Sequence, residues 1–335
     1  MNVAARIAIF STSLVGVGAG CASSSNRIAS ATIRPIDEDL IALLPPGADA
    51  VFDVDVEQLK DWPNCKRILA LLPEAGQARL HQLGFDPLED VEAVLGAVQK
   101  FGLSDSSSIV LVRGALDLDQ LKKTLGVQTT EVDYRGARIV ESGLGDDSKG
   151  NPDAPAIGRV GPRLTVFGSR VDVRRTLDVV QKESEGIRSA VMARALIHAY
   201  SRAPTAKSGR PAVVAGIVPS AEFRERLRGE GFSLADADWV TLAFAVGDGF
   251  DIGLIVGTGT EGGALDLMRA WNKSVHDFKE RPMIRLTGLA SYLDPLVIVT
   301  SGREVHVAFR MEGARLESLL GRVDTFLREK GAPRR

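Results

Sequence analysis

The feature that most constrains the fold is a pair of alternating apolar segments joined by a tight turn. Apolar residues occupy every second position of residues 240–246 and again of residues 250–256, with Gly247-Asp248-Gly249 between them. Period-two alternation on both sides of a glycine-containing turn predicts an antiparallel β-hairpin with one apolar face. Two further hairpins are predicted around Gly161-Pro162 and Ser301-Gly302. The chain is therefore expected to form antiparallel sheet.

Each predicted hairpin is followed by a segment with the spacing of a one-sided helix. This combination predicts an α+β fold of largely antiparallel sheets, covered on one face by amphipathic helices. Three shorter strands also precede helices and end at a residue suited to N-capping: Ala50–Val54 with Asp55, Ser108–Arg113 with Asp117, and Ala212–Val218 with Ser220. The apolar positions of the helices after the hairpins are Val173, Leu177 and Val180; Ala264, Met268, Trp271, Val275 and Phe278; and Leu316, Leu319, Leu320, Val323 and Leu327.

The pattern of strands followed by helices recurs along the chain. It predicts two related α+β halves over residues 43–203 and 209–330. A segment rich in Pro, Ser, Gly and Lys, residues 203–211, is the predicted hinge.

The N-terminal 25 residues have the order of an export signal. A polar start leads into a mostly apolar run of 13 residues, Ile7–Ala19, which ends in small residues before Cys21. A membrane-spanning helix needs about 20 apolar residues, so this run suits a signal peptide better. We predict a signal peptide over residues 1–20 and a flexible tether over residues 21–42, which is rich in Ser and Ala and then acidic.

The residues Gly18-Ala19-Gly20-Cys21 resemble the lipobox of bacterial lipoproteins, in which the cysteine after the cut carries diacylglycerol and an acyl chain. The resemblance implies that Cys21 is acylated with fatty acids such as palmitate. Lipoboxes usually place a branched aliphatic residue where this chain has Gly18. Ala22 is not an acidic inner-membrane retention residue, so the resemblance favours the periplasmic side of the outer membrane. Plain secretion, with cleavage near Ala19 or Ala22, is the alternative.

Two short sequence segments resemble segments of uncharacterised bacterial envelope proteins that have no assigned activity. They are Leu44–Asp49 before a strand and Asp133–Gly136 between two strands. The resemblance implies an exported domain and no particular chemistry.

The composition excludes some classes of partner. The formal charge is −2, and it becomes −3 without the first 20 residues, so no nucleic-acid footprint is expected. If Cys21 is acylated, Cys65 has no disulfide partner. We expect Cys65 to be a buried structural thiol in a helix.

One segment, Gly257–Gly262, fits the dinucleotide-binding pattern G-x-G-x-x-G. However, the preceding strand belongs to an antiparallel hairpin, and the acidic residue about 20 positions on, Asp277, falls inside a helix. The segment is interpreted as a strand-to-helix link with Thr260 or Glu261 near the helix start. No cofactor is predicted.

No catalytic or metal-ligating set is predicted. The four histidines lack metal-ligand spacing, and His306 is expected to face solvent. The acidic loop Gly145–Asp153 lacks EF-hand spacing and is interpreted as solvated. There is no G-x-S-x-G elbow.

These observations favour a membrane-anchored, non-catalytic envelope lipoprotein with a binding or structural role. Its partners would be the membrane, through the N-terminal lipid, and an envelope protein or a small ligand. Two alternatives remain open. One is an exported hydrolase with a site of scattered residues. The other is a soluble periplasmic ligand-binding protein with a cleft at the hinge.

Overall fold

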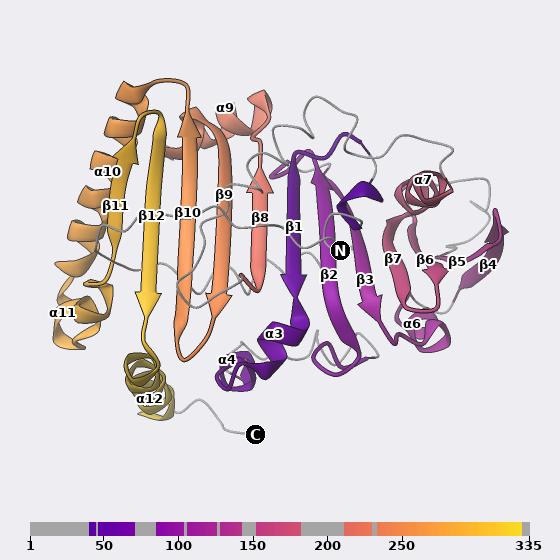
Figure 1. Cartoon of the computed structure of the whole chain (residues 1–335), viewed down its shortest axis with the longest axis horizontal. Helices are drawn as coiled ribbons and strands as arrows, with labels where there is room; N and C mark the ends of the chain where they lie inside the picture. The colour runs from indigo at the N-terminus through magenta and orange to yellow at the C-terminus, as the bar shows by residue number, and fades with distance from the viewer. Residues whose placement is uncertain are drawn as a thin grey trace.

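The computed structural model describes residues 40–44, 46–70, 85–103, 106–125, 128–142, 152–181, 211–229 and 233–329. These residues form a broad sheet with helices at its faces and ends (Figure 1). The N-terminal part contains β1 (Ala50–Asp55), α3 (Val56–Asp61), α4 (Cys65–Ala70), β2 (Val91–Gln99), β3 (Ser107–Gly114), α6 (Leu118–Leu125), β4 (Thr129–Tyr134), β5 (Ala137–Ser142), β6 (Pro155–Gly161), β7 (Leu164–Ser169) and α7 (Arg170–Val180). The C-terminal part contains β8 (Val213–Ile217), α9 (Ala221–Gly229), η2 (Ser233–Asp236), β9 (Ala237–Val246), β10 (Phe250–Thr258), α10 (Glu261–Lys279), α11 (Pro282–Leu286), η3 (Leu289–Leu293), β11 (Val297–Ser301), β12 (Glu304–Met311) and α12 (Gly313–Glu329).

The strands of the described residues form one 12-stranded sheet, in the order β11-β12-β10-β9-β8-β1-β2-β3-β7-β6-β5-β4. Neighbouring strands run antiparallel throughout. The predicted α+β content with antiparallel pairing is therefore confirmed. The strands of the two predicted halves lie in one sheet, because β1 pairs directly with β8 and joins the two parts of the chain (Figure 1).

An aromatic ring packs at the junction of β1 with its two neighbours. Phe52 lies opposite Gly96 of β2 and Ala215 of β8. The Phe52 ring occupies the space that a Cβ atom on Gly96 would need. A small residue on each side of Phe52 thus makes room for its ring near the middle of the sheet, where the two parts of the chain meet.

Apolar cores lie on both faces of the sheet. Four consecutive residues of β3, Ile109–Val112, are buried, although successive side chains of a strand point to opposite faces. Helix α6 shares a core with Val110, whereas α7 shares a different core with Leu111. The expectation that helices cover one face and leave the other polar is therefore wrong for this part of the sheet.

All three predicted hairpins are confirmed. Strands β6–β7, β9–β10 and β11–β12 pair across the expected turns, and each hairpin is followed by a helix, namely α7, α10 and α12. One residue of the predicted apolar stripe on α10 behaves differently. Ala264 is fully buried, but Phe278 near the end of the helix is 38% exposed.

The packed body begins earlier than the sequence suggested. Leu40 and Ile41 are each 5% exposed, within the segment 21–42 that we expected to be a tether. They contact the same core as Leu44 and Val51. None of the described helices is both long enough and apolar enough to span a membrane.

Candidate functional site

The predicted lipidation site, Cys21, lies outside the described residues, as do the signal peptide and residues 21–39. Cys65 is a free, buried cysteine at the start of α4, and burial raises the pKa of its thiol. A thiol with a raised pKa stays protonated at neutral pH and is a poor nucleophile. The predicted structural role of Cys65 is confirmed.

The glycine-rich segment at residues 257–262 forms a strand-to-helix link, as predicted. It leaves β10, which pairs antiparallel with β9 and β12, and Thr260 caps α10 by accepting a hydrogen bond from Gly263 N at 3.0 Å. The indole of Trp239 fills the space beside Gly257 that a Cβ atom would need. Packing against Trp239 therefore accounts for Gly257 without a bound phosphate.

His306 is less exposed than the sequence suggested. Its side chain is 19% exposed, and Nε2 lies 3.1 Å from Glu304 Oε2. His306 lies on the face of β12 opposite buried Val305 and Phe309, on the same side as exposed Arg310, so the predicted orientation is confirmed although the side chain is only partly exposed. Among the described residues, no group of three or more His, Cys, Asp or Glu could hold a metal ion. Residues 143–151 of the acidic loop lie outside the described part.

A buried ionic cluster joins α7 to β5. Glu141 is 5% exposed and contacts Arg170 Nε at 2.8 Å and Arg174 Nη2 at 2.7 Å. Arg174 also lies over the Tyr134 ring, and the Tyr134 hydroxyl donates to Asp178 at 3.0 Å. The charged groups of this cluster pair with one another, so the cluster holds α7 on the sheet and offers no free acid or base.

An open hollow of about 430 Å³ lies where the β4–β5 and β6–β7 turns meet the end of α7. Two of its three arginines are paired with carboxylates: Arg135 with Asp178 and Arg138 with Glu131. Arg159 donates to backbone carbonyls. Its lining, which consists of Arg135, Gly136, Ala137, Arg138, Arg159, Val160, Gly161, Pro162, Leu177, Val180 and Gln181, holds no nucleophile and no acid–base pair.

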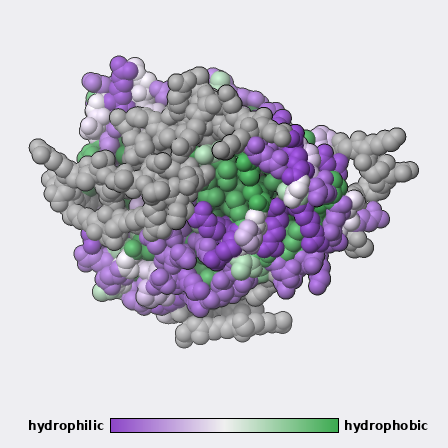
Figure 2. All heavy atoms as spheres, turned by 45° about the vertical axis from the view of Figure 1, so that its right-hand side comes forward, coloured by the Kyte–Doolittle hydropathy of each residue, from purple (hydrophilic) through white to green (hydrophobic). Residues whose placement is uncertain are grey.

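In the view of Figure 2, which brings this end of the sheet forward, hydrophilic residues surround an apolar area near the middle and smaller apolar areas beside it. Strand β4, at that edge of the sheet, is charged at Glu131 and Asp133. Charged edge strands resist pairing with other chains, so this edge is protected rather than built for docking.

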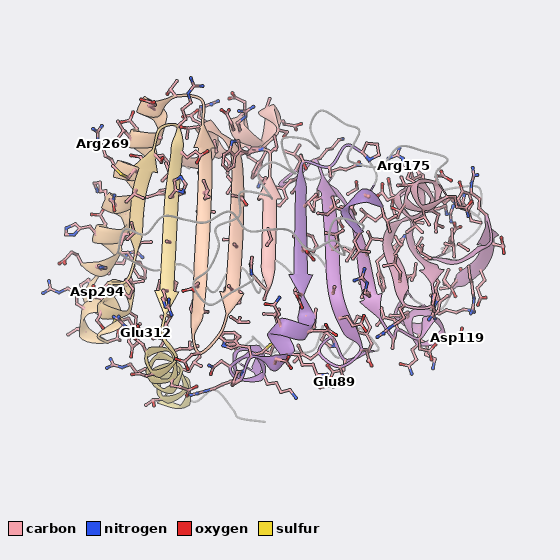
Figure 3. All side chains as sticks on the ribbon, in the orientation of Figure 1. Glu89, Asp119, Arg175, Arg269, Asp294 and Glu312 are labelled. Carbon is pink, nitrogen blue, oxygen red and sulfur yellow. The ribbon has the colours of Figure 1, made fainter. Side chains whose placement is uncertain are left out.

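A different surface forms at the opposite end of the sheet, around α11. We define the α11 surface as Phe278, Met283 and Leu286 together with Arg281 and Arg285. Met283 is 61% exposed and Leu286 is 84% exposed. The Arg281 guanidinium lies over the Phe278 ring, 5.3 Å from its centroid. Asp294, labelled beside α11 in Figure 3, pairs with Lys279 at 3.0 Å and not with an arginine of this surface.

Two arginines of α12 hold the segment that follows α11. Arg322 Nη1 donates to Thr287 O at 2.9 Å, and Arg315 donates to Ser291 O. Both guanidiniums also lie over the Tyr292 ring, at 5.6 and 5.7 Å from its centroid. The α11 surface is therefore fixed in place by contacts on its inner side. The sequence signal for it was the run Pro282-Met283-Ile284-Arg285-Leu286, which our sequence analysis did not single out.

Comparisons with known proteins supply no family. No family model matches this chain, and no curated protein is similar enough to count as a relative. Among solved structures, crystal form I of TP0453 is similar with a TM-score of 0.41 and 12% sequence identity, covering 88% of this chain and 99% of that one. A likeness at this level carries no argument about function.

Proposed function

We propose that this chain is a membrane-anchored, non-catalytic envelope lipoprotein with a binding or structural role. The observation that carries the proposal is Cys21, at the end of an apolar run too short to span a bilayer. Acyl chains on this cysteine would hold the protein to a membrane, since each buried CH₂ contributes about 0.8 kcal/mol. Ala22 supports the outer membrane as the location.

The described residues support binding over catalysis. The hollow beside α7 is lined without a nucleophile or an acid–base pair, and the buried ionic cluster at Glu141 is paired internally. The alternative of a ligand cleft between two halves loses support, because β1 and β8 pair directly and leave one continuous sheet there. The partner proposed for the body is an envelope protein, a small ligand or the membrane surface itself.

We also propose that the two parts of the sheet are related halves. The N-terminal part has the strand order β1-β2-β3-β7-β6, and the C-terminal part has the order β8-β9-β10-β12-β11. In each part the first three strands are consecutive in the sequence, and a helix precedes the hairpin that completes the order. On this reading, β4 and β5 are additions to the N-terminal half, and β1 and β8 are equivalent strands that pair across a pseudo-two-fold axis.

The lipoprotein proposal is tested by replacing the acylated residue. We expect Cys21→Ser to move the protein from the membrane fraction to the soluble fraction and to abolish incorporation of labelled palmitate. Cys65→Ala is the matched control, since its thiol is buried and takes no part in anchoring. A Cys21→Ser protein that stays in the membrane with its N-terminus cleaved would contradict the proposal.

A further inference from the structure

The α11 surface concentrates the exposed apolar side chains of the described residues. Five large hydrophobic residues are exposed among all the described residues, and three of them, Phe278, Met283 and Leu286, lie within nine positions of one another at this surface. Single exposed apolar residues are ordinary on protein surfaces, whereas a cluster at one place indicates an interaction site.

The charges around this cluster are predominantly positive. Glu280 is paired with Arg285 at 3.1 Å, so its charge is compensated. Arg281, Arg315 and Arg322 contact aromatic rings or backbone carbonyls, and none of the three forms an ion pair among the described residues. Asp277, whose carboxylate is close enough to feel the charge of Arg281, is itself paired with Lys273 at 2.5 Å. Three cations without paired anions favour a negatively charged partner.

The apolar residues are held outward by the local structure. Pro282 starts α11, and the segment reverses at Gly288, which has φ 69°. Leu289, after the reversal, packs against the main core. Because the inner side of this segment is occupied and is fixed by Arg322, Met283 and Leu286 have no position in the core to turn into. Met283 and Leu286 are therefore exposed in the native fold itself.

From this geometry we propose that the α11 surface docks on an anionic lipid bilayer. Met283 and Leu286 enter the headgroup region, and Arg281 on the same surface faces lipid phosphates. Arg315 and Arg322, which are bound on the inner side of the segment, add positive charge behind it. Apolar residues flanked by arginines are the composition of interfacial membrane-binding segments. This inference rests on the proposed lipid anchor for its choice of partner over an acidic protein. The proposed anchor at Cys21 lies 19 positions before Leu40, where the packed body begins, so an anchored body stays near the membrane and weak docking suffices.

The test places an environment-sensitive dye on the surface of the full lipidated protein in vesicles. Leu286→Cys is labelled in a Cys65→Ala background, and the matched control is Glu225→Cys on α9, an exposed site on another element. We expect the emission at position 286 to shift to the blue in vesicles containing phosphatidylglycerol, and less so in pure phosphatidylcholine. We expect no shift at position 225 in either.

A charge variant tests the role of the arginines. Arg281→Gln should lower the ratio of docked to undocked protein about fivefold in anionic vesicles, the effect of about 1 kcal/mol per basic residue. Arg269→Gln, at an exposed residue of α10 that is paired with Asp266 and labelled in Figure 3, should leave the ratio unchanged.

An unshifted dye at position 286, or an equal shift at position 225, would overturn the docking proposal and favour a protein partner for this surface. Mass analysis of the N-terminal peptide separates this result from failure of the lipid anchor. A shifted dye on an unacylated chain would preserve docking and refute the anchor. A dye whose emission does not shift, on a chain that is acylated, would refute docking and support the lipid anchor.

Discussion

Two glutamates on neighbouring strands have the same kind of partners but different surroundings. Glu141 is 5% exposed and contacts Arg170 and Arg174. Glu131 is exposed and contacts Arg138 and Lys122. A buried charge that loses its partner is costly, whereas an exposed ion pair contributes little. The sequence does not distinguish these residues, because burial depends on α7 packing over β5.

Replacing the buried glutamate should destabilise the fold. We expect Glu141→Gln to lower the free energy of unfolding by about 3 kcal/mol, because it leaves the mostly buried guanidinium of Arg170 without its counter-ion. Urea denaturation followed by circular dichroism measures the change. Glu131→Gln is the matched control, and it should shift the urea concentration at the midpoint of unfolding far less than Glu141→Gln does. Equal shifts for the two variants would contradict the argument from burial.

The exposed glutamate should nevertheless titrate abnormally. Hydrogen bonds from Arg138 and Lys122 lower the pKa of Glu131 to about 2. A lowered carboxyl pKa means that the pair stabilises the folded state above the ordinary glutamate pKa, and that this stabilisation is lost as the pH falls from about 4.5 through about 2. Carboxyl NMR should find the Glu131 midpoint near pH 2, and Arg138→Gln should raise it. An ordinary midpoint in the wild-type protein would refute the hydrogen-bonded pair.

At the scale of elements, local sequence signals predicted the starts of helices correctly. The three predicted N-caps accept hydrogen bonds at their helix starts: Asp55 from Gln58 N at 3.1 Å, Asp117 from Asp119 N at 2.8 Å and Ser220 from Phe223 N at 3.2 Å. Capping and period-two alternation involve residues close in sequence, so they can be predicted without the fold. The turn glycines, in contrast, differ in ways that only distant contacts explain.

Two turn glycines should respond oppositely to the same substitution. A Cβ atom on Gly249, in the β9–β10 turn, would collide with the backbone oxygen of Met311, whereas one on Gly161, the last residue of β6 before its turn, meets nothing within 4 Å. We expect Gly249→Ala to destabilise the protein by about 2 kcal/mol and Gly161→Ala to be neutral or slightly stabilising. Thermal unfolding of both variants measures this. A stable Gly249→Ala protein would contradict the close approach of β12.

At the scale of the whole molecule, the decisive contact is the pairing of β1 with β8. It turns two stretches of chain that the sequence treats as separate units into one sheet with two edges, β11 and β4. Both β1 and β8 would become open edges if the chain were divided.

The divided chain should therefore fail to form two well-behaved domains. We expect residues 40–203, which keep the buried Leu40 and Ile41, and residues 209–330, expressed separately, to aggregate, because each exposes an apolar strand edge that the intact protein covers. Analytical ultracentrifugation of each fragment, beside the intact chain, measures this. Recovery of a native-like circular dichroism spectrum when the two fragments are mixed would support the pairing of β1 with β8. A stable monomeric fragment with native-like structure would contradict it.

The sequence by itself determined the antiparallel hairpins, the helices that follow them and the caps. These features arise from residues that are neighbours along the chain. Only the tertiary structure decided that the strands join in one sheet, that apolar cores lie on both faces and that Phe278 is exposed while Ala264 is buried. Strand partners far apart in sequence are chosen by packing, and the exposure of each residue of an amphipathic helix depends on which elements pack against it. No local pattern records either outcome.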